Sequence, residues 1–117
     1  MTTRVIVSAI VTEQDSADFE RAYAAVRPQV LTTPGHLGNA LYRDAEDPTR
    51  YILESEWESE EVFREWEDKP IHRETTAPMH RLWRGVERRI YNLAVGGTVT
   101  AGEAQVVGAA QAVGGAR

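Results

Sequence analysis

The apolar segment Val5–Val11 constrains the fold more than any other feature of this sequence. Its residues are β-branched or small, and apolar side chains fall on both faces of an extended chain, which is typical of a strand covered on both sides. Only two helical patterns follow in the chain, and two helices can cover one face of a small sheet. The second face therefore needs a partner, so we expect a homodimer in which two sheets share a barrel-like interior.

A helix and a pair of strands are predicted after this segment. The helix is indicated by apolar side chains at helical spacing, which are Phe19, Tyr23, Val26 and Val30. The segments His36–Arg43 and Arg50–Trp57 read as strands, and the Asp-rich turn between them predicts a hairpin.

A second helix is predicted to begin just beyond this hairpin. Ser59 is placed to cap it, and the two glutamates that follow are favourable near the positive end of a helix. Pro70 is expected to begin a further helical turn through His72, and Pro78 is expected to interrupt it.

The predicted order is strand, helix, strand, strand, helix, strand, and the last strand is Val86–Leu93. This is the split βαβ, or ferredoxin-like, arrangement of the α+β class, in which both helices pack on one face of a four-stranded antiparallel sheet. We assign this domain to residues 1–93. Two such domains paired through their sheets form a dimeric α+β barrel.

The composition changes from Ala94 onward. Gly, Ala, Val and Gln dominate, and the only charged residues are Glu103 and Arg117. Such a segment buries too little area to offset the entropy lost on ordering, so residues 94–117 are predicted to be a flexible tail. The alternative is that its valines dock on the partner subunit, namely Val99, Val106 and Val107.

The overall composition argues against several classes of protein. A formal net charge of −5 disfavours nucleic acid or an anionic membrane as the main partner. The absence of Cys removes disulfides and thiolate sites. No apolar run reaches membrane-spanning length and no signal peptide is evident, so we expect a soluble cytoplasmic protein.

The segment from Ser55 to Arg73 gathers the strongest candidates for a site. Trp57 and Trp66 offer large aromatic surfaces, and the imidazole of His72 titrates near neutral pH, so it can take up and return a proton. This set suits a flat, apolar molecule that carries an acidic proton. The alternative is structural: two core tryptophans, and a histidine that bonds the backbone near Pro70.

Further candidates lie on the predicted strands and on the second helix. Trp66 and Asn39 join His72 as candidate catalytic residues. The candidates for substrate binding are Trp57, Phe63, Tyr51 and Arg88. Each strand residue can also be purely structural. The histidines lack the close spacing of a local metal site, and no dinucleotide or phosphate loop is present, so we expect no metal and no cofactor.

Four segments carry a resemblance to a known family, namely Thr33–Asn39, Glu54–Trp57, Glu58–Trp66 and His72–Pro78. Over Val5–Leu93 the chain resembles the antibiotic biosynthesis monooxygenases, which are dimeric α+β barrels. The last of the four segments is similar to members associated with aromatic polyketide pathways. The family also includes haem-degrading enzymes, quorum-signal processing proteins and near relatives that cyclise polyketides.

The resemblance separates haem-degrading from quinone-forming members. Haem-degrading members have an Asn in the first strand and a haem-ligating His after the helical Trp; this chain keeps Trp66 but has Ser8 and Thr76 at the other two positions. Quinone-forming members have a Trp at the position of Trp57, which this chain keeps. Their neighbouring helical Tyr corresponds to Phe63 and their strand Asn falls near Leu53, so neither the phenol nor the amide carries over to this chain.

The resemblance therefore implies a cofactor-independent monooxygenase that uses molecular oxygen to convert an aromatic polyketide intermediate of the anthrone or phenol type to a quinone. His72 would act as the base, and Asn39 or Arg88 would steady the enolate oxygen. A polyketide cyclase that performs an aldol closure in the same cavity is the first alternative. A non-catalytic barrel that binds a small molecule is the second.

Overall fold

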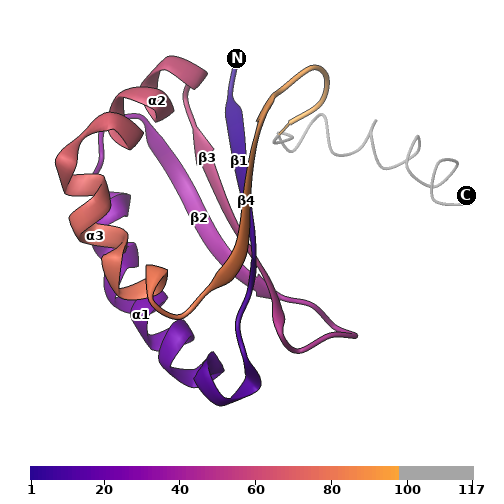
Figure 1. Ribbon diagram of the computed structural model, residues 1–117. Coiled ribbons are helices and arrows are strands. Elements are labelled where there is room, and N and C mark those ends of the chain that lie inside the picture. Colours follow the sequence, from indigo (N-terminus) through magenta and orange to yellow (C-terminus); the bar gives the residue numbers. More distant parts are fainter. Residues whose placement is uncertain (98–117) are drawn as a thin grey trace, which may run out of the picture.

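A computed structural model describes residues 1–97, which form a four-stranded antiparallel sheet with helices packed on one face (Figure 1). The elements are β1 (Thr3–Ile10), a 3-10 turn (Glu13–Asp15), α1 (Ser16–Leu31), β2 (His36–Arg43), β3 (Arg50–Trp57), α2 (Glu60–Asp68), α3 (Pro70–His80) and β4 (Arg84–Asn92). The predicted tail residues from 98 onward, including Val99, Val106 and Val107, lie outside the described part.

The strand order is β2-β3-β1-β4, with every neighbouring pair antiparallel. This order confirms the predicted ferredoxin-like α+β fold. Strand β1 is central: Val5 lies opposite Ser55 of β3 on one side and Ile90 of β4 on the other. Strands β2 and β4 form the two edges. Among the described helices, none has the length and apolar content needed to cross a bilayer.

The two faces of the sheet differ. Val5 and Ala9 of β1 are buried beneath the helices, whereas Arg4 and Ser8 are exposed on the opposite face. That outer face is therefore mixed rather than wholly apolar. Its exposed apolar side chains are Ile10, Leu37, Tyr42, Ile52 and Tyr91. No helix of the described chain covers them, as Figure 1 shows, so the expected homodimer remains a prediction.

The helical layer corrects one expectation. Pro78 does not interrupt the turn that starts at Pro70, because α3 runs on to His80 and forms a third helix, separated from α2 by the extended residue Lys69. A proline removes the hydrogen bond to the carbonyl of the residue four positions before it, here Glu74. Both Glu74 and Pro78 are exposed near the end of α3, where water can satisfy that carbonyl.

A backbone hydrogen bond and close packing connect the start of α2 to the residue that precedes β2. As predicted, Ser59 caps the helix: its Oγ accepts a hydrogen bond from the Val62 backbone N–H at 3.2 Å. The backbone N–H of Glu58 donates to the Gly35 carbonyl at 2.8 Å. Gly35 has a φ of +82°, and a Cβ there would lie 2.5 Å from Val62 Cγ1. Only glycine fits this junction without strain.

We therefore expect Gly35→Ala to lower the free energy of unfolding by about 1–3 kcal/mol, because it combines a strained φ with a clash. Chemical denaturation measures this change. Gly38→Ala is the matched control, since a Cβ at Gly38 meets no atom within 4 Å and its φ is not positive. Equal stability of the two variants would contradict the role of Gly35.

The outer face gives a second prediction. Sedimentation at micromolar concentration should give twice the chain mass, and Ile52→Lys should give the monomer, because it places a charge in the centre of the predicted interface. Ile71→Lys, at a similarly exposed residue on α3, is the control and should leave the dimer intact. A monomeric wild-type protein would remove the argument for a shared barrel.

Candidate functional site

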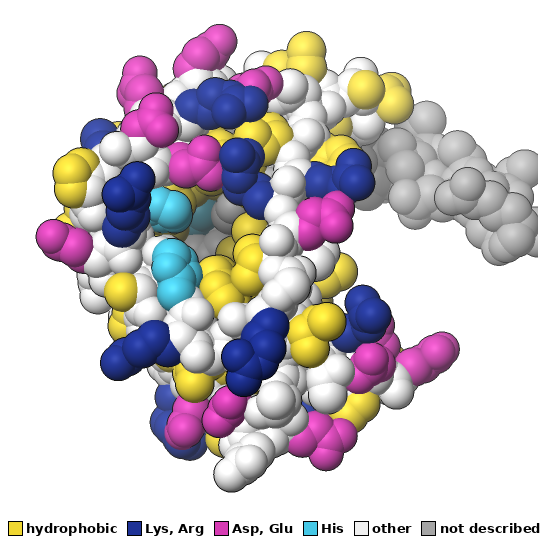
Figure 2. Space-filling view, in the orientation of Figure 1, with side chains coloured by type: hydrophobic (Ala, Val, Ile, Leu, Met, Phe, Trp, Pro, Cys, Tyr) yellow, Lys and Arg dark blue, Asp and Glu magenta, His cyan; other side chains and the backbone are white. Residues whose placement is uncertain are grey.

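A cavity of about 270 Å³ lies between the sheet and the helices. Figure 2 shows it as a hollow with hydrophobic side chains inside, histidines at its side and charged side chains around the rim. All four strands and all three α-helices contribute to its lining. Six predicted site residues line it, namely Asn39, Trp57, Phe63, Trp66, His72 and Arg88.

Aromatic rings form one wall of the cavity. Trp57 is fully buried, and its indole N–H donates to Ser55 Oγ at 2.9 Å. Its ring centroid lies 5.1 Å from that of Trp66 and 5.5 Å from that of Phe63. The wall continues to His72, whose ring meets Trp66 edge-on at 4.3 Å. These rings join the end of β3 to α2 and to the first turn of α3.

His72 lines the cavity, and its surroundings lower the pKa of its imidazole. Burial is the main cause that lowers its pKa below the ordinary value of 6.5, and the charge of His80 lowers it further. The carboxylate of Glu67 acts in the opposite direction but does not outweigh burial. A neutral imidazole at pH 7 can accept a proton from a bound molecule.

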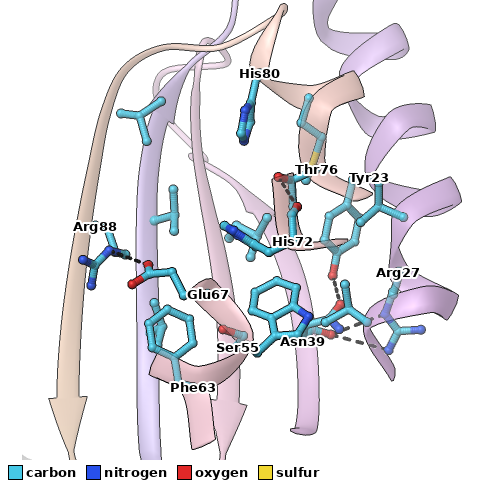
Figure 3. Close-up of a pocket in the computed structure, with 18 of the residues that line it drawn as sticks. Tyr23, Arg27, Asn39, Ser55, Phe63, Glu67, His72, Thr76, His80 and Arg88 are labelled. Carbon is cyan, nitrogen blue, oxygen red and sulfur yellow. Dashed lines mark hydrogen bonds and ion pairs between the residues drawn. The ribbon is translucent and has the colours of Figure 1, made fainter. Parts of the chain in front are cut away.

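An ion pair lies on the β4 side of the cavity. Arg88 Nε of β4 lies 3.0 Å from a carboxylate oxygen of Glu67 of α2, and both residues line the cavity (Figure 3). The guanidinium also lies over the Phe63 ring, 5.9 Å from its centroid. Arg88 is exposed, so this side of the cavity is in contact with solvent.

A second polar group comes from α1 and β2. Tyr23 OH donates to Asn39 Oδ1, and Asn39 Nδ2 lies 2.9 Å from His36 Nε2. Because the amide oxygen accepts from Tyr23, the amide NH₂ is the donor to His36. Arg27 Nε and Nη2 each lie 3.4 Å from the Asn39 backbone carbonyl. Burial, followed by the charge of Arg27, lowers the pKa of His36.

Tyr23 and Arg27 line the cavity, although neither is among the predicted site residues. The sequence pattern places Tyr23 on the apolar face of its helix and gives no role to Arg27. Their spacing of four places them on one side of α1. Two polar side chains four residues apart, beside the apolar face of this helix, are the sequence pattern that could have indicated a site here.

Tyr51 is in a different place from the one predicted. It does not line this cavity; it packs on Phe19 at a centroid distance of 5.0 Å, and its OH donates to Glu20 at 2.5 Å. Tyr51 shares the helix-facing side of β3 with Trp57, but six residues of extended chain separate the two by about 20 Å. Tyr51 therefore faces the helices, as Trp57 does, but lies too far along β3 to reach the cavity.

The structure also locates Ser8 and Thr76, the two positions that the resemblance relates to haem binding. Ser8 lies on the outer face of the sheet, and the β1 residues that line the cavity are Val5 and Val7. Thr76 lines the cavity, but its hydroxyl donates to the His72 carbonyl at 2.8 Å. Within residues 1–97, no group of three or more His, Asp or Glu side chains is arranged to hold a metal.

Comparisons with curated proteins give two kinds of relative. A 42.8 kDa protein of the whiE locus of Streptomyces coelicolor is 31% identical over 90 residues, which cover 77% of this chain and 23% of that protein. The chain thus spans less than a quarter of that relative. A mycobilin-producing heme oxygenase of Mycobacterium tuberculosis is 34% identical over 53 residues, covering 45% of this chain and 50% of the enzyme.

The fold is shared with solved structures. One is SnoaB, a cofactor-independent oxygenase from Streptomyces nogalater, with a TM-score of 0.72 and 17% identity over 81% of this chain and 95% of that chain. At this identity the likeness concerns the fold alone. A family model, described as antibiotic biosynthesis monooxygenase, matches residues 1–78. The chain therefore belongs to the antibiotic biosynthesis monooxygenase family.

Proposed function

We propose that this protein is a cofactor-independent monooxygenase that oxidises an aromatic polyketide intermediate of the anthrone or phenol type to a quinone. The observation that carries the proposal is the position of His72, which lines an aromatic-walled cavity with its ring edge-on to Trp66. The description of SnoaB, which shares the fold, as a cofactor-independent oxygenase supports the same class of reaction. The volume of about 270 Å³ is near the lower end of small-molecule sites, which suits a compact ring system.

In this reaction the protein removes one proton and holds the resulting anion. The rings of the substrate stack on Trp66, which is partly exposed and packs on the buried ring of Trp57, away from bulk water. His72 accepts a proton from the acidic C–H of an anthrone CH₂ group. The electron pair of that bond then delocalises into an enolate. Arg88 and Asn39 are the candidate donors to its oxygen.

Oxygen then reacts with the carbanion form of the substrate. A new C–O bond forms as O₂ is reduced to a peroxide anion, which takes a proton from His72 to give a hydroperoxide. Loss of the second hydrogen on that carbon and cleavage of the O–O bond release water and leave a carbonyl group. In sum, a CH₂ group and O₂ give C=O and H₂O, so no other reductant is needed.

Haem is not part of this proposal, because two positions that the resemblance relates to haem binding carry other residues here. The β1 side chains that face the cavity are valines, and Thr76 stands where haem-degrading members are expected to have the ligating His. The Thr76 hydroxyl is already bonded to the helix backbone.

The decisive experiment is incubation of the purified protein with a model anthrone while an oxygen electrode records uptake and absorbance records the quinone. We expect equimolar oxygen uptake and quinone formation. Consumption of a polyketide substrate without oxygen uptake would point to a cyclase instead. Ligand binding without turnover would point to a non-catalytic barrel.

His72→Gln should lower the turnover number about a hundred-fold, as expected for the loss of a general base, and should leave the melting temperature nearly unchanged. The base acts when deprotonated, so the wild-type rate should rise with pH through the lowered pKa of His72 and level off above it. The midpoint should therefore lie below pH 6.5, the ordinary value for His.

His80→Gln is the matched control for this test. His80 also lines the cavity, and its charge lowers the pKa of His72. This variant should keep the acidic limb of the pH–rate curve and move its midpoint slightly upward. If His72→Gln keeps the limb, His72 is not the base.

A further inference from the structure

The cavity has a polar corner between α1 and β2, formed by Tyr23, Arg27 and Asn39. In Figure 3 these side chains gather on one side of the cavity, and Arg88 and Glu67 lie on the other. The separation follows from the sheet order, since Asn39 lies on the edge strand β2 and Arg88 on the edge strand β4. Three inter-strand spacings of about 4.8 Å separate these strands.

Most of the hydrogen-bonding groups in this corner that could still bind a ligand are donors. Asn39 Oδ1 already accepts from Tyr23 OH, and one Asn39 N–H is directed to His36 Nε2. The second amide N–H of Asn39 remains, as do those N–H groups of Arg27 that are not directed to the Asn39 carbonyl or to the Tyr23 hydroxyl. An arginine has five such donors and no acceptor. The corner therefore suits a ligand group that accepts hydrogen bonds.

The charge of Arg27 favours an anion among such groups. Its two contacts to the Asn39 carbonyl are 3.4 Å long, beyond the usual 2.7–3.2 Å of a protein hydrogen bond. No carboxylate of residues 1–97 lies within ion-pair distance of it, whereas Arg88 is paired with Glu67. Arg27 is exposed, so its guanidinium lies where this end of the apolar cavity meets solvent, and no carboxylate of residues 1–97 pairs with it there.

We infer that this corner binds a carboxylate of the aromatic substrate, with Arg27 as the residue that selects it. A guanidinium forms two parallel hydrogen bonds to a carboxylate, which sets direction as well as affinity. The ring system then extends from the corner along the tryptophan wall toward β4. This inference rests on the proposed function only in that the cavity is taken to be the substrate site.

Calorimetric titration with 2-naphthoate and with its neutral isostere 2-naphthamide tests the inference without requiring turnover. At pH 7 and low ionic strength, the wild-type protein should bind the carboxylate about tenfold more tightly than the amide. Arg27→Gln should abolish this preference and leave the affinity for the amide unchanged. Arg27→Lys keeps the charge without the planar fork and should show an intermediate preference.

Arg21→Gln is the matched control. Arg21 lies on the same helix, is exposed, pairs with Asp18 and does not line the cavity, so its loss should leave the preference intact. A preference that survives in Arg27→Gln but disappears in Arg88→Gln would place the anion at the β4 side and overturn the inference. Equal affinities of the wild-type protein for the two ligands would overturn it and leave the cavity as an aromatic site. Binding of neither ligand would overturn both.

Discussion

The packing of Trp57 is the interaction on which the rest of the site depends. This side chain is fully buried at the end of β3, and its ring lies within 4.4–5.5 Å of the rings of His36, Trp66 and Phe63. It therefore joins β2, β3 and α2 at one point. A well-packed aromatic ring of this size contributes several kcal/mol to the folded state, so the wall of the cavity is also part of the core. The same packing that stabilises the fold therefore also holds the wall of the cavity in place.

The two sides of the cavity differ in their balance of charge. On the β4 side the cation of Arg88 faces the anion of Glu67. On the α1–β2 side the cation of Arg27 is exposed and pairs with no carboxylate of residues 1–97, and burial together with that charge lowers the pKa of the nearby His36. Between them, burial lowers the pKa of His72. The cavity is therefore polarised from one edge strand to the other, although most of its lining is apolar.

Much of this architecture was readable in the sequence, and the exceptions have physical reasons. The alternation of β3 and the Ser59 cap are local patterns, and Trp57, Trp66 and His72 lie close together in the chain, so that part of the site was predictable. Tyr23 and Asn39 meet only because α1 packs on β2, a tertiary contact that no local pattern encodes. Tyr51 shows that alternation gives the face of a strand but not the distance along it. Pro78 shows that an exposed proline near the end of a helix can be tolerated.

The alternation of apolar and acidic side chains along β3 also disfavours pairing of this strand in a wrong register. Leu53, Ser55 and Trp57 face the helices, whereas Glu54 and Glu56 lie on the other face, where both carboxylates lie within 3.4 Å of Arg4. A slip of one residue in the pairing of β3 would turn both carboxylates toward the core and the tryptophan toward the outside. Burial of two unpaired carboxylates costs several kcal/mol, so a misregistered sheet is strongly disfavoured during folding. The pattern that shapes the cavity thus also selects a single pairing of strands.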